Sequence, residues 1–369
     1  MNFSCEKKLL FDNINVVMKA VSTKSTVPIL EGIYIKAENN KVKLFANDLK
    51  IAIEANIECE VEEAGEIVLN AKLFFEIISK LPEGIVNIST DGDLKTNIKC
   101  LASKFEIFGM NPEDFPSVEY NESDEKIKIS KTILKNIIRQ TIFSIGTDEK
   151  KIVLTGALFA VNNKELKVVT LDGFRLSYRK TELSSDTLMT ASYIIPGKTL
   201  SDLLKILNDE ESEVNICFTG NRVNINFDNC ILYSNLIDGE FFNYEHILPN
   251  RCELNCICDT KSIIDSIIRS SLIITPDVKS PLKFDISKDQ IYMTSMSKNG
   301  KAEDTLMCKT DGGDLSIGFN HKYLLDALRA CDTKEVKLEF TSSLNPLVIK
   351  GADDDSFIYL VLPLRLRNE

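Results

Sequence analysis

Three cysteines in the last third of the chain have a spacing that could bind a metal ion. They are Cys252, Cys256 and Cys258, and thiolates are good zinc ligands. A structural zinc site, however, normally needs four ligands with paired C-x2–4-C spacing. Together with Leu254, the last two cysteines also alternate as small apolar residues do along one face of a strand. We therefore predict a buried strand here, and we expect neither a metal centre nor another cofactor.

The motifs that mark the common enzyme classes are absent from the sequence. It contains no dinucleotide-binding glycine pattern, no phosphate-binding P-loop, no nucleophile elbow and no zinc-protease helix motif. The two histidines, His246 and His321, are isolated from each other. Carboxylates far apart in the sequence could still meet in the fold. An enzyme that uses carboxylates and a metal ion on nucleic acid is therefore kept as an alternative.

The basic residues point to a different chemistry, the neutralisation of phosphates. Lys131, Lys135 and Arg139 follow one another at four-residue steps, so they share one face of a predicted helix. Such a row could follow a phosphate backbone, or it could be an ordinary solvated face. The net charge of −11 argues against a nucleic-acid-binding surface over the whole molecule. The six helices predicted below are nevertheless each net positive, and most acidic residues lie outside them.

Those helices belong to a repeat that is as long as a domain. We predict them over 7–20, 71–80, 131–143, 197–208, 261–272 and 321–331. A phrase made of a lysine, an acid four residues later and two apolar residues begins at Lys72, Lys198 and Lys322, at steps of 126 and 124 residues. A second phrase, which opens the other three helices, keeps nearly the same spacing. Solenoid repeats are about 20–50 residues long, so this spacing indicates one whole domain used three times.

Each third of the chain reads as strand, helix, several strands, helix and further strands, which predicts an α+β fold. Asn70 and Asn320 stand where helix N-caps belong. We place the three domains at 1–121, 122–250 and 251–369. No apolar run reaches the roughly 18 residues of a membrane span, and the N-terminus lacks a signal-peptide pattern. The ten scattered cysteines fit reduced thiols, so we expect a cytoplasmic protein.

Five phrases, weak alone and highly specific together, point to a known family. They are TVPIL at 26–30, LDGFRL at 171–176, LIDGEF at 236–241, Tyr244 with ILP at 247–249, and LPLRL at 362–366. With them the chain resembles the bacterial DNA polymerase III beta subunit, the DNA sliding clamp family, over essentially its whole length. The resemblance implies three DNA-clamp domains per chain, each with two helices packed on antiparallel sheets, which together form half of a ring.

The resemblance also implies what the protein does. Two copies would join head to tail, the first domain of one to the third domain of the other, by strand pairing at sheet edges. The ring would encircle duplex DNA and slide, which suits a few weak phosphate contacts. It would be a processivity factor and not an enzyme, with the replicative polymerase, the clamp loader and repair proteins as partners. The implied DNA-binding residues are Lys24, Lys150, Lys151 and Lys198.

Finally, the resemblance implies a hydrophobic cleft between the second and third domains that receives short hydrophobic peptide motifs. The matching positions are Leu154, Leu171, Gly173, Phe174, Arg175, Leu176, Phe242, His246, Ile247, Leu360, Val361, Leu362, Pro363, Leu364 and Arg365. Read without the family, these leucines could be plain core. We expect the two arginines at the rim. A monomeric peptide-binding scaffold without DNA is a further alternative.

Four positions of the expected cleft depart from the family pattern. Leu171 replaces a usual threonine, Phe174 a usual histidine, Phe242 a frequent proline and His246 a frequent arginine. We therefore expect a cleft that is more apolar and less basic, with a shifted peptide preference.

Overall fold

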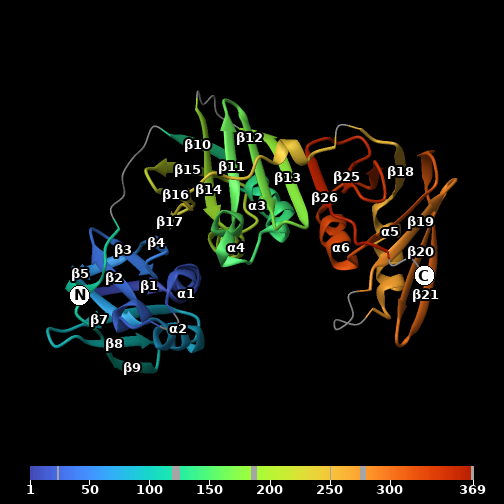
Figure 1. Cartoon of the computed structure of the whole chain (residues 1–369). Helices are drawn as coiled ribbons and strands as arrows, with labels where there is room; N and C mark the ends of the chain where they lie inside the picture. Colours follow the sequence, from blue (N-terminus) through green and yellow to red (C-terminus); the bar gives the residue numbers. More distant parts are fainter. Residues whose placement is uncertain (23–24, 119–124, 184–188, 250, 275–279, 367–369) are drawn as a thin grey trace. The chain divides into compact units, whose positions relative to one another are not determined.

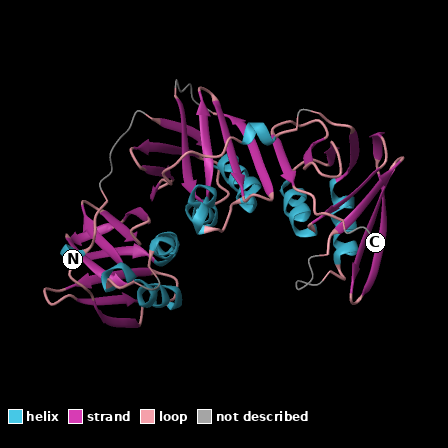
Figure 2. Cartoon of the chain, viewed as in Figure 1, coloured by secondary structure: helices cyan, strands magenta, loops and turns pink. Residues whose placement is uncertain are grey.

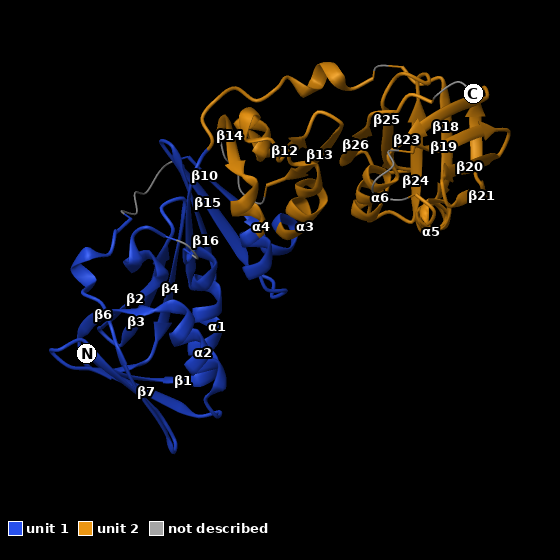
Figure 3. Cartoon of the chain, turned by 60° about the horizontal axis from the view of Figure 1, so that its bottom comes forward, with its two compact units in different colours: residues 1–134, 202–236 blue, residues 135–201, 237–369 orange. Residues whose placement is uncertain are grey.

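The computed structural model describes residues 1–22, 25–118, 125–183, 189–249, 251–274 and 280–366 (Figure 1). The chain forms two compact units, each described here by itself (Figure 3). Unit 1 comprises residues 1–134 and 202–236, and unit 2 comprises residues 135–201 and 237–369. The division between the two units falls inside the second repeat. The units therefore do not coincide with the three predicted domains.

The chain consists of three similar series of helices and strands, whose helices and strands Figure 2 distinguishes by colour. The first series is β1 Asn2–Glu6, α1 Lys7–Val17, β2 Gly32–Glu38, β3 Lys41–Asn47, β4 Ile51–Glu58, β5 Glu60–Glu63, β6 Gly65–Asn70, α2 Ala71–Lys80, β7 Ile85–Thr90, β8 Lys95–Cys100 and β9 Ser103–Phe108. The second is β10 Lys126–Ser130, α3 Lys131–Thr141, β11 Gly156–Asn162, β12 Glu165–Leu171, β13 Arg175–Glu182, β14 Thr190–Pro196, α4 Gly197–Ile206, β15 Glu213–Thr219, β16 Arg222–Phe227 and β17 Cys230–Asn235.

The third series is β18 Leu254–Asp259, α5 Thr260–Ser271, β19 Leu282–Ser287, β20 Gln290–Ser297, β21 Gly300–Met307, β22 Lys309–Gly312, β23 Leu315–Phe319, α6 His321–Ala330, β24 Glu335–Phe340, β25 Leu347–Gly351 and β26 Phe357–Val361. In each series a strand and a helix precede the central strands, and a second helix precedes the last three described strands. The predicted α+β repeat is therefore confirmed.

The helix boundaries follow from local chemistry. Asn70 accepts a hydrogen bond from the backbone N–H of Leu73, so α2 begins where the N-cap was predicted. Asn320 caps α6 in the same way. The predictions for α1 and α3 run too long, because the chain tightens into short 3-10 turns at Met18–Ala20 and Ile142–Ser144. These turns continue the apolar pattern, so periodicity alone does not reveal the change.

In unit 1, one sheet crosses from the first repeat into the second. The five-stranded sheet has the order β5-β1-β7-β8-β9, and the eight-stranded sheet has the order β10-β15-β16-β17-β4-β3-β2-β6. The crossing pair is β17 and β4, which run antiparallel with Leu232 opposite Ile53. Both side chains are fully buried.

Unit 2 repeats this arrangement one domain later. Its nine-stranded sheet has the order β14-β11-β12-β13-β26-β25-β24-β18-β22, and its four-stranded sheet has the order β21-β20-β19-β23. Here β13 and β26 run antiparallel with Ser177 opposite Tyr359. Equivalent residues can be identified from the pairing of each strand with its neighbour in the same repeat. By this criterion Ser177 is equivalent to Ile53, and Tyr359 is equivalent to Leu232. The two junctions therefore use the same strands in the same register.

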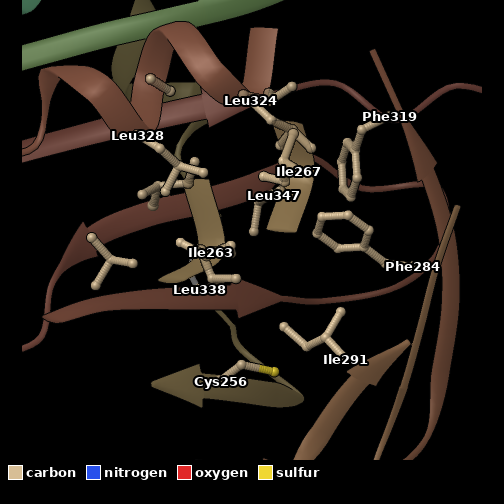
Figure 4. Packing of buried hydrophobic residues seen from close by; sticks show 14 of the residues in the cluster. Cys256, Ile263, Ile267, Phe284, Ile291, Phe319, Leu324, Leu328, Leu338 and Leu347 are labelled. Carbon is tan, nitrogen blue, oxygen red and sulfur yellow. The ribbon is translucent and has the colours of Figure 1, made fainter. Parts of the chain in front are cut away.

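The core of the third repeat shows why its cysteines are structural. Leu254, Cys256 and Cys258 are all buried on one face of β18, which confirms the predicted strand. Cys256 lies in the cluster that also holds Phe284 and Phe319 (Figure 4). A cysteine in such surroundings acts as a small apolar residue. Among the described residues, no group of three or more His, Cys, Asp or Glu side chains could hold a metal ion.

Lys131 does not belong to a row of surface cations. It is fully buried, and its Nζ lies 2.7 and 2.8 Å from the two carboxylate oxygens of Asp228 and 2.6 Å from Oδ1 of Asn208. Arg139, on the same helix, pairs with Asp332 at 2.7 Å. The interpretation of this lysine as a phosphate contact is wrong, because a buried ammonium group requires a counter-charge and spends its hydrogen bonds there.

Candidate functional site

Unit 2 contains an apolar cavity of about 480 Å³, a size typical of ligand-binding pockets. It lies where β13 of the second repeat pairs with β26 of the third, two strands that run side by side in Figure 1. The lining residues are Lys151, Val153, Leu154, Leu171, Gly173, Phe174, Arg175, Leu176, Glu240, Phe242, Ile247, Pro346, Leu360 and Leu362.

The turn between β12 and β13 shapes one wall of this cavity. Asp172 accepts backbone hydrogen bonds through Oδ1 from Phe174 at 2.8 Å and from Arg175 at 3.1 Å, which is the usual way aspartate stabilises a tight turn. Gly173 has a φ of +92°, a conformation that glycine adopts without strain. The backbone N–H of Leu362 then donates to the carbonyl of Phe174 at 2.9 Å. The turn and the C-terminal segment are thereby held together.

The cavity has a buried floor and an exposed apolar rim. Leu171, Leu176 and Leu360 are almost fully buried and belong to one hydrophobic cluster. By contrast, Phe174 and Phe242 are 58% and 57% exposed. Large apolar side chains left open around a hollow are typical of a surface that binds a hydrophobic partner. Whether this cleft is more apolar and less basic than is usual in the family stays a prediction.

Arg175 is engaged inside the protein instead of standing free at the rim. Its Nε lies 2.9 Å from Oδ2 of Asp172, and one terminal nitrogen lies 2.5 Å from Oδ2 of Asp326 on α6. The guanidinium also stacks 4.5 Å from the ring centroid of Tyr323, and Phe174 stacks on that same tyrosine. With two carboxylates and a ring as partners, this arginine ties the turn to α6.

A second cavity of about 480 Å³ adjoins the first. The two share Lys151, Leu154, Phe174 and Arg175. The second is more polar, because its walls include the side chains of Thr147, Asp148, Asp172 and Tyr323. An extended peptide could therefore place apolar residues in one cavity and polar residues in the other.

Buried tyrosines lie in the cluster beneath the apolar floor. Burial raises the pKa of Tyr178 to about 12, and it also raises the pKa of Tyr244. Their rings pack 6.0 Å apart. Both hydroxyls therefore stay neutral near pH 7, and the floor carries no charge of its own.

Most of the sequence-predicted cleft residues lie around the first cavity, and five do not. The ten that line it are Leu154, Leu171, Gly173, Phe174, Arg175, Leu176, Phe242, Ile247, Leu360 and Leu362. His246 is exposed beside it, and Val361 is buried in the core of the third repeat because alternate residues of β26 face opposite sides. Pro363, Leu364 and Arg365 are outside the lining, since Leu364 donates to the carbonyl of Gly318 at 2.8 Å.

The lining also includes residues that the sequence analysis did not assign to it. Val153, Glu240 and Pro346 were not singled out, and Lys151 was expected to bind DNA instead. Val153 could have been found as the apolar neighbour of Leu154. Pro346 carries no such signal, because only the pairing of β25 with β26 brings it to the cavity.

The described lysines that were expected to bind DNA lie in two elements of unit 2. Lys150 and Lys151 are exposed in the 3-10 segment Glu149–Thr155, where Asp148 accepts a hydrogen bond from the backbone of Lys150. Lys198 is exposed in the first turn of α4. Lys24 lies outside the described residues. Their exposure alone does not distinguish these described lysines from other surface lysines.

Comparison with known proteins decides the family. Models of the DNA polymerase III beta subunit match residues 1–119 with its N-terminal domain, 128–243 with its central domain and 245–365 with its C-terminal domain. The chain belongs to the DNA polymerase III beta subunit family. The curated beta sliding clamp of Staphylococcus epidermidis is 33% identical over 99% of both chains.

Solved structures of this family have the same fold. The DNA polymerase III beta subunit from Eubacterium rectale is 38% identical with a TM-score of 0.94, and the match covers 99% of each chain. The DNA polymerase sliding clamp from Bacillus subtilis is 32% identical with a TM-score of 0.96 over 100% of both chains. The chain is thus a sliding-clamp family member along its whole length. Among its described helices, none is long and apolar enough to cross a membrane.

Proposed function

We propose that this protein is a DNA sliding clamp that encircles duplex DNA as a closed ring of two copies and tethers a replicative polymerase to it. It would act in the cytoplasm by retention, without catalysing a reaction. Three domains at 1–121, 122–250 and 251–369 would make up each half of the ring. The single observation that carries the proposal is that strands of neighbouring repeats pair in the same way twice, β17 with β4 and β26 with β13. The same rule identifies one more pair of equivalent strands, and these have no such partner among the described strands of the chain.

Those two strands are β9 and β21. In the two junctions within the chain, the last strand of one repeat pairs with the fourth strand of the preceding repeat. The corresponding last strand of the first repeat is β9, and the corresponding strand of the third repeat is β21. Both lie at the edge of their sheets. An exposed edge is a template for another strand, so β9 of one copy suits β21 of a second copy.

The register of that pairing follows from the junctions already present. Counted through the strand pairs, Phe105 is equivalent to Leu232, and Ala302 is equivalent to Ile53. Phe105 should therefore face Ala302 of the second copy. Lys104 would then face its Glu303, and Glu106 would face its Lys301. Opposite charges at directly paired strand positions are stabilising, so the sequence of both edges supports this register.

The apolar cavity would serve as the docking site for short hydrophobic segments of the polymerase, the clamp loader and repair proteins. Its size, apolar floor and open aromatic rim support this assignment. Lys150 and Lys198 are proposed to touch the phosphate backbone, together with Lys24. Lys151 could serve either role, since it also lines the cavity. A clamp loader would supply the ATP chemistry that opens the ring.

Retention on DNA of different topology tests the function. Because a ring holds DNA by linkage and not by strong contacts, loaded protein should persist on closed circular DNA for many times longer than on linear DNA of the same sequence. Gel filtration of the complexes before and after linearisation with a nuclease measures this. Equal loss from both forms would contradict the ring. A chain that sediments as a monomer and still binds hydrophobic peptides would favour the monomeric scaffold.

A further inference from the structure

The turn that shapes the apolar cavity occurs a second time, in unit 1. Asp48 accepts backbone hydrogen bonds through Oδ1 from Lys50 at 2.9 Å and from Ile51 at 2.8 Å, as Asp172 does in unit 2. Leu49 has a φ of +71° where Gly173 has +92°. The backbone N–H of Asn235 donates to the carbonyl of Lys50 at 3.3 Å. This bond is the counterpart of the one between Leu362 and Phe174.

The hydrophobic cluster beneath the turn is also duplicated. In unit 1 the cluster contains Leu30, Ala52 and Tyr233. Their equivalents in unit 2 are Leu154, Leu176 and Leu360, which all line the apolar cavity. The junction between the first two repeats is therefore built on the same plan as the proposed peptide cleft.

The hollow at this second junction is small and polar. Its volume is about 140 Å³, against about 480 Å³ for the apolar cavity. Asn47 stands in place of Leu171, Tyr233 in place of Leu360, and Asn235 in place of Leu362. Arg222 stands in place of Pro346, as counted through the paired strands. A hollow of this volume is below the usual range for binding pockets.

Hydrogen bonds hold the polar residues across the hollow. The side-chain amide of Asn47 donates to the carbonyl of Pro116 at 3.2 Å, and its Oδ1 accepts from the backbone of Leu49 at 2.7 Å. The side chain of Asn235 donates to the carbonyl of Leu49 at 3.5 Å. An apolar ligand would have to break these bonds and bury the amides unpaired, which costs free energy. The ring of Tyr233 also takes up space that a leucine would leave open.

We infer that the junction of the first and second repeats is a second copy of the peptide cleft, and that Asn47, Tyr233 and Asn235 keep it closed to hydrophobic peptides. These three residues thereby determine that each chain offers one cleft instead of two. The inference rests on the proposed peptide-binding function of the unit 2 cavity. It assigns a specificity role to residues far from that cavity in the sequence.

A reciprocal exchange of residues tests the inference. The opened variant carries Asn47→Leu, Tyr233→Leu and Asn235→Leu, and the closed variant carries Leu171→Asn, Leu360→Tyr and Leu362→Asn. The probe is a fluorescent, end-capped peptide with two leucines and a phenylalanine, titrated into each protein while the number of sites is measured by calorimetry. We expect one site for the wild type, two for the opened variant and none for the closed variant.

The outcomes separate the inference from the function on which it rests. If the wild type binds one peptide and a folded opened variant still binds one, the inference is overturned and the function stands. If the wild type binds none, the proposed cleft is wrong. In that case the opened variant alone tests the inference. A peptide site gained in this variant supports the inference that the three residues close the junction, and the absence of a gained site overturns it. Should the triple variant not fold, Asn47→Leu with Asn235→Leu is the substitute, with at least a tenfold gain in peptide affinity expected at this junction.

Discussion

Leu362 and Leu364 show how similar residues can acquire different roles. They are two positions apart and almost equally exposed, at 38% and 37%. Leu362 lines the apolar cavity. Leu364 lies outside this lining, and its backbone forms an antiparallel bridge with Gly318 of β23. Both were predicted to belong to the cleft, because both match cleft positions that the family resemblance implies. Exposure and residue type therefore do not settle the role of either leucine.

This difference gives a matched pair of substitutions. Leu362→Ala should weaken binding of a hydrophobic peptide by roughly 10- to 30-fold, since removing the buried contact of a leucine costs about 1.5–2 kcal/mol. Leu364→Ala should change peptide affinity less than about twofold. Fluorescence anisotropy measures both, and unchanged dimer mass in sedimentation serves as the control. Equal effects of the two substitutions would argue against the assigned cavity.

Arg175 shows the limit of reading residue type from a sequence. Arg175, together with Arg365, was expected to stand at the rim of the cleft. Its two carboxylate partners and the ring of Tyr323 instead occupy its hydrogen bonds and its face. Asp326 and Tyr323 lie about 150 residues further along the chain, and no local pattern connects them with the turn.

At the scale of the element, α5 and α6 each begin at a side chain that caps the helix N-terminus. The contribution of each cap to stability can be tested. In α5 the cap is Asp259, whose side chain accepts a hydrogen bond from the backbone N–H of Ser262. Hydrogen bonds from the hydroxyl and backbone N–H of Ser262 lower the pKa of Asp259 below its ordinary value. In α6 the cap is Asn320, which accepts a backbone hydrogen bond but does not titrate.

These two caps predict different pH dependence. Because the pKa of Asp259 is lower in the folded state, its stabilising contribution is complete above the ordinary carboxyl range. It is lost as the pH falls through the folded pKa. Asp259→Ala should therefore destabilise the protein at pH 7, and its cost should shrink as the pH is lowered below the ordinary carboxyl range, as judged by urea unfolding. Asn320→Ala should cost the same throughout this pH range. A pH-independent effect of Asp259→Ala would show that its charge plays no part.

At the scale of the whole molecule, the repeats leave β9 and β21 as unmatched edges. Each of these strands ends in an exposed apolar side chain, Phe108 in β9 and Met307 in β21. An isolated chain with such edges would be prone to association. In the proposed ring, pairing β9 of one copy with β21 of the other would remove this liability, and this junction would have the same plan as the two within the chain.

Charge exchange across the proposed interface tests this arrangement. Lys104→Glu should place two carboxylates opposite each other and weaken the dimer at least tenfold, because like charges at paired positions are destabilising. Combining it with Glu303→Lys should restore most of the affinity. Sedimentation equilibrium at low salt measures the dissociation constant.

Lys99→Gln provides the control for this exchange, because it removes a neighbouring charge without placing an acid opposite Lys104. Lys99 is exposed and lies opposite Lys104 within the same subunit, on the strand next to the edge. It should have little effect on the dimer. If the double variant dissociates as readily as Lys104→Glu alone, the proposed register is incorrect.

The sequence by itself determined the properties that depend on nearby residues. Helix periodicity, N-caps and alternating strands act over a few residues, and the threefold repeat is a repetition of those local patterns. For this reason the order of helices and strands could be predicted closely, while the ends of α1 and α3 could not. The cleft phrases were predicted only through their resemblance to the family, because by composition alone the leucines could equally belong to a core.

Only the tertiary structure decided which distant residues meet. The pairing of β13 with β26 brings Leu176 opposite Leu360, and it sends Val361 into another core and Leu364 away from the cavity. The same pairing at β4 and β17 creates a junction that polar side chains fill. Strand pairing at such sequence distance depends on the topology of the whole chain. A local pattern therefore cannot distinguish an open cleft from its closed copy.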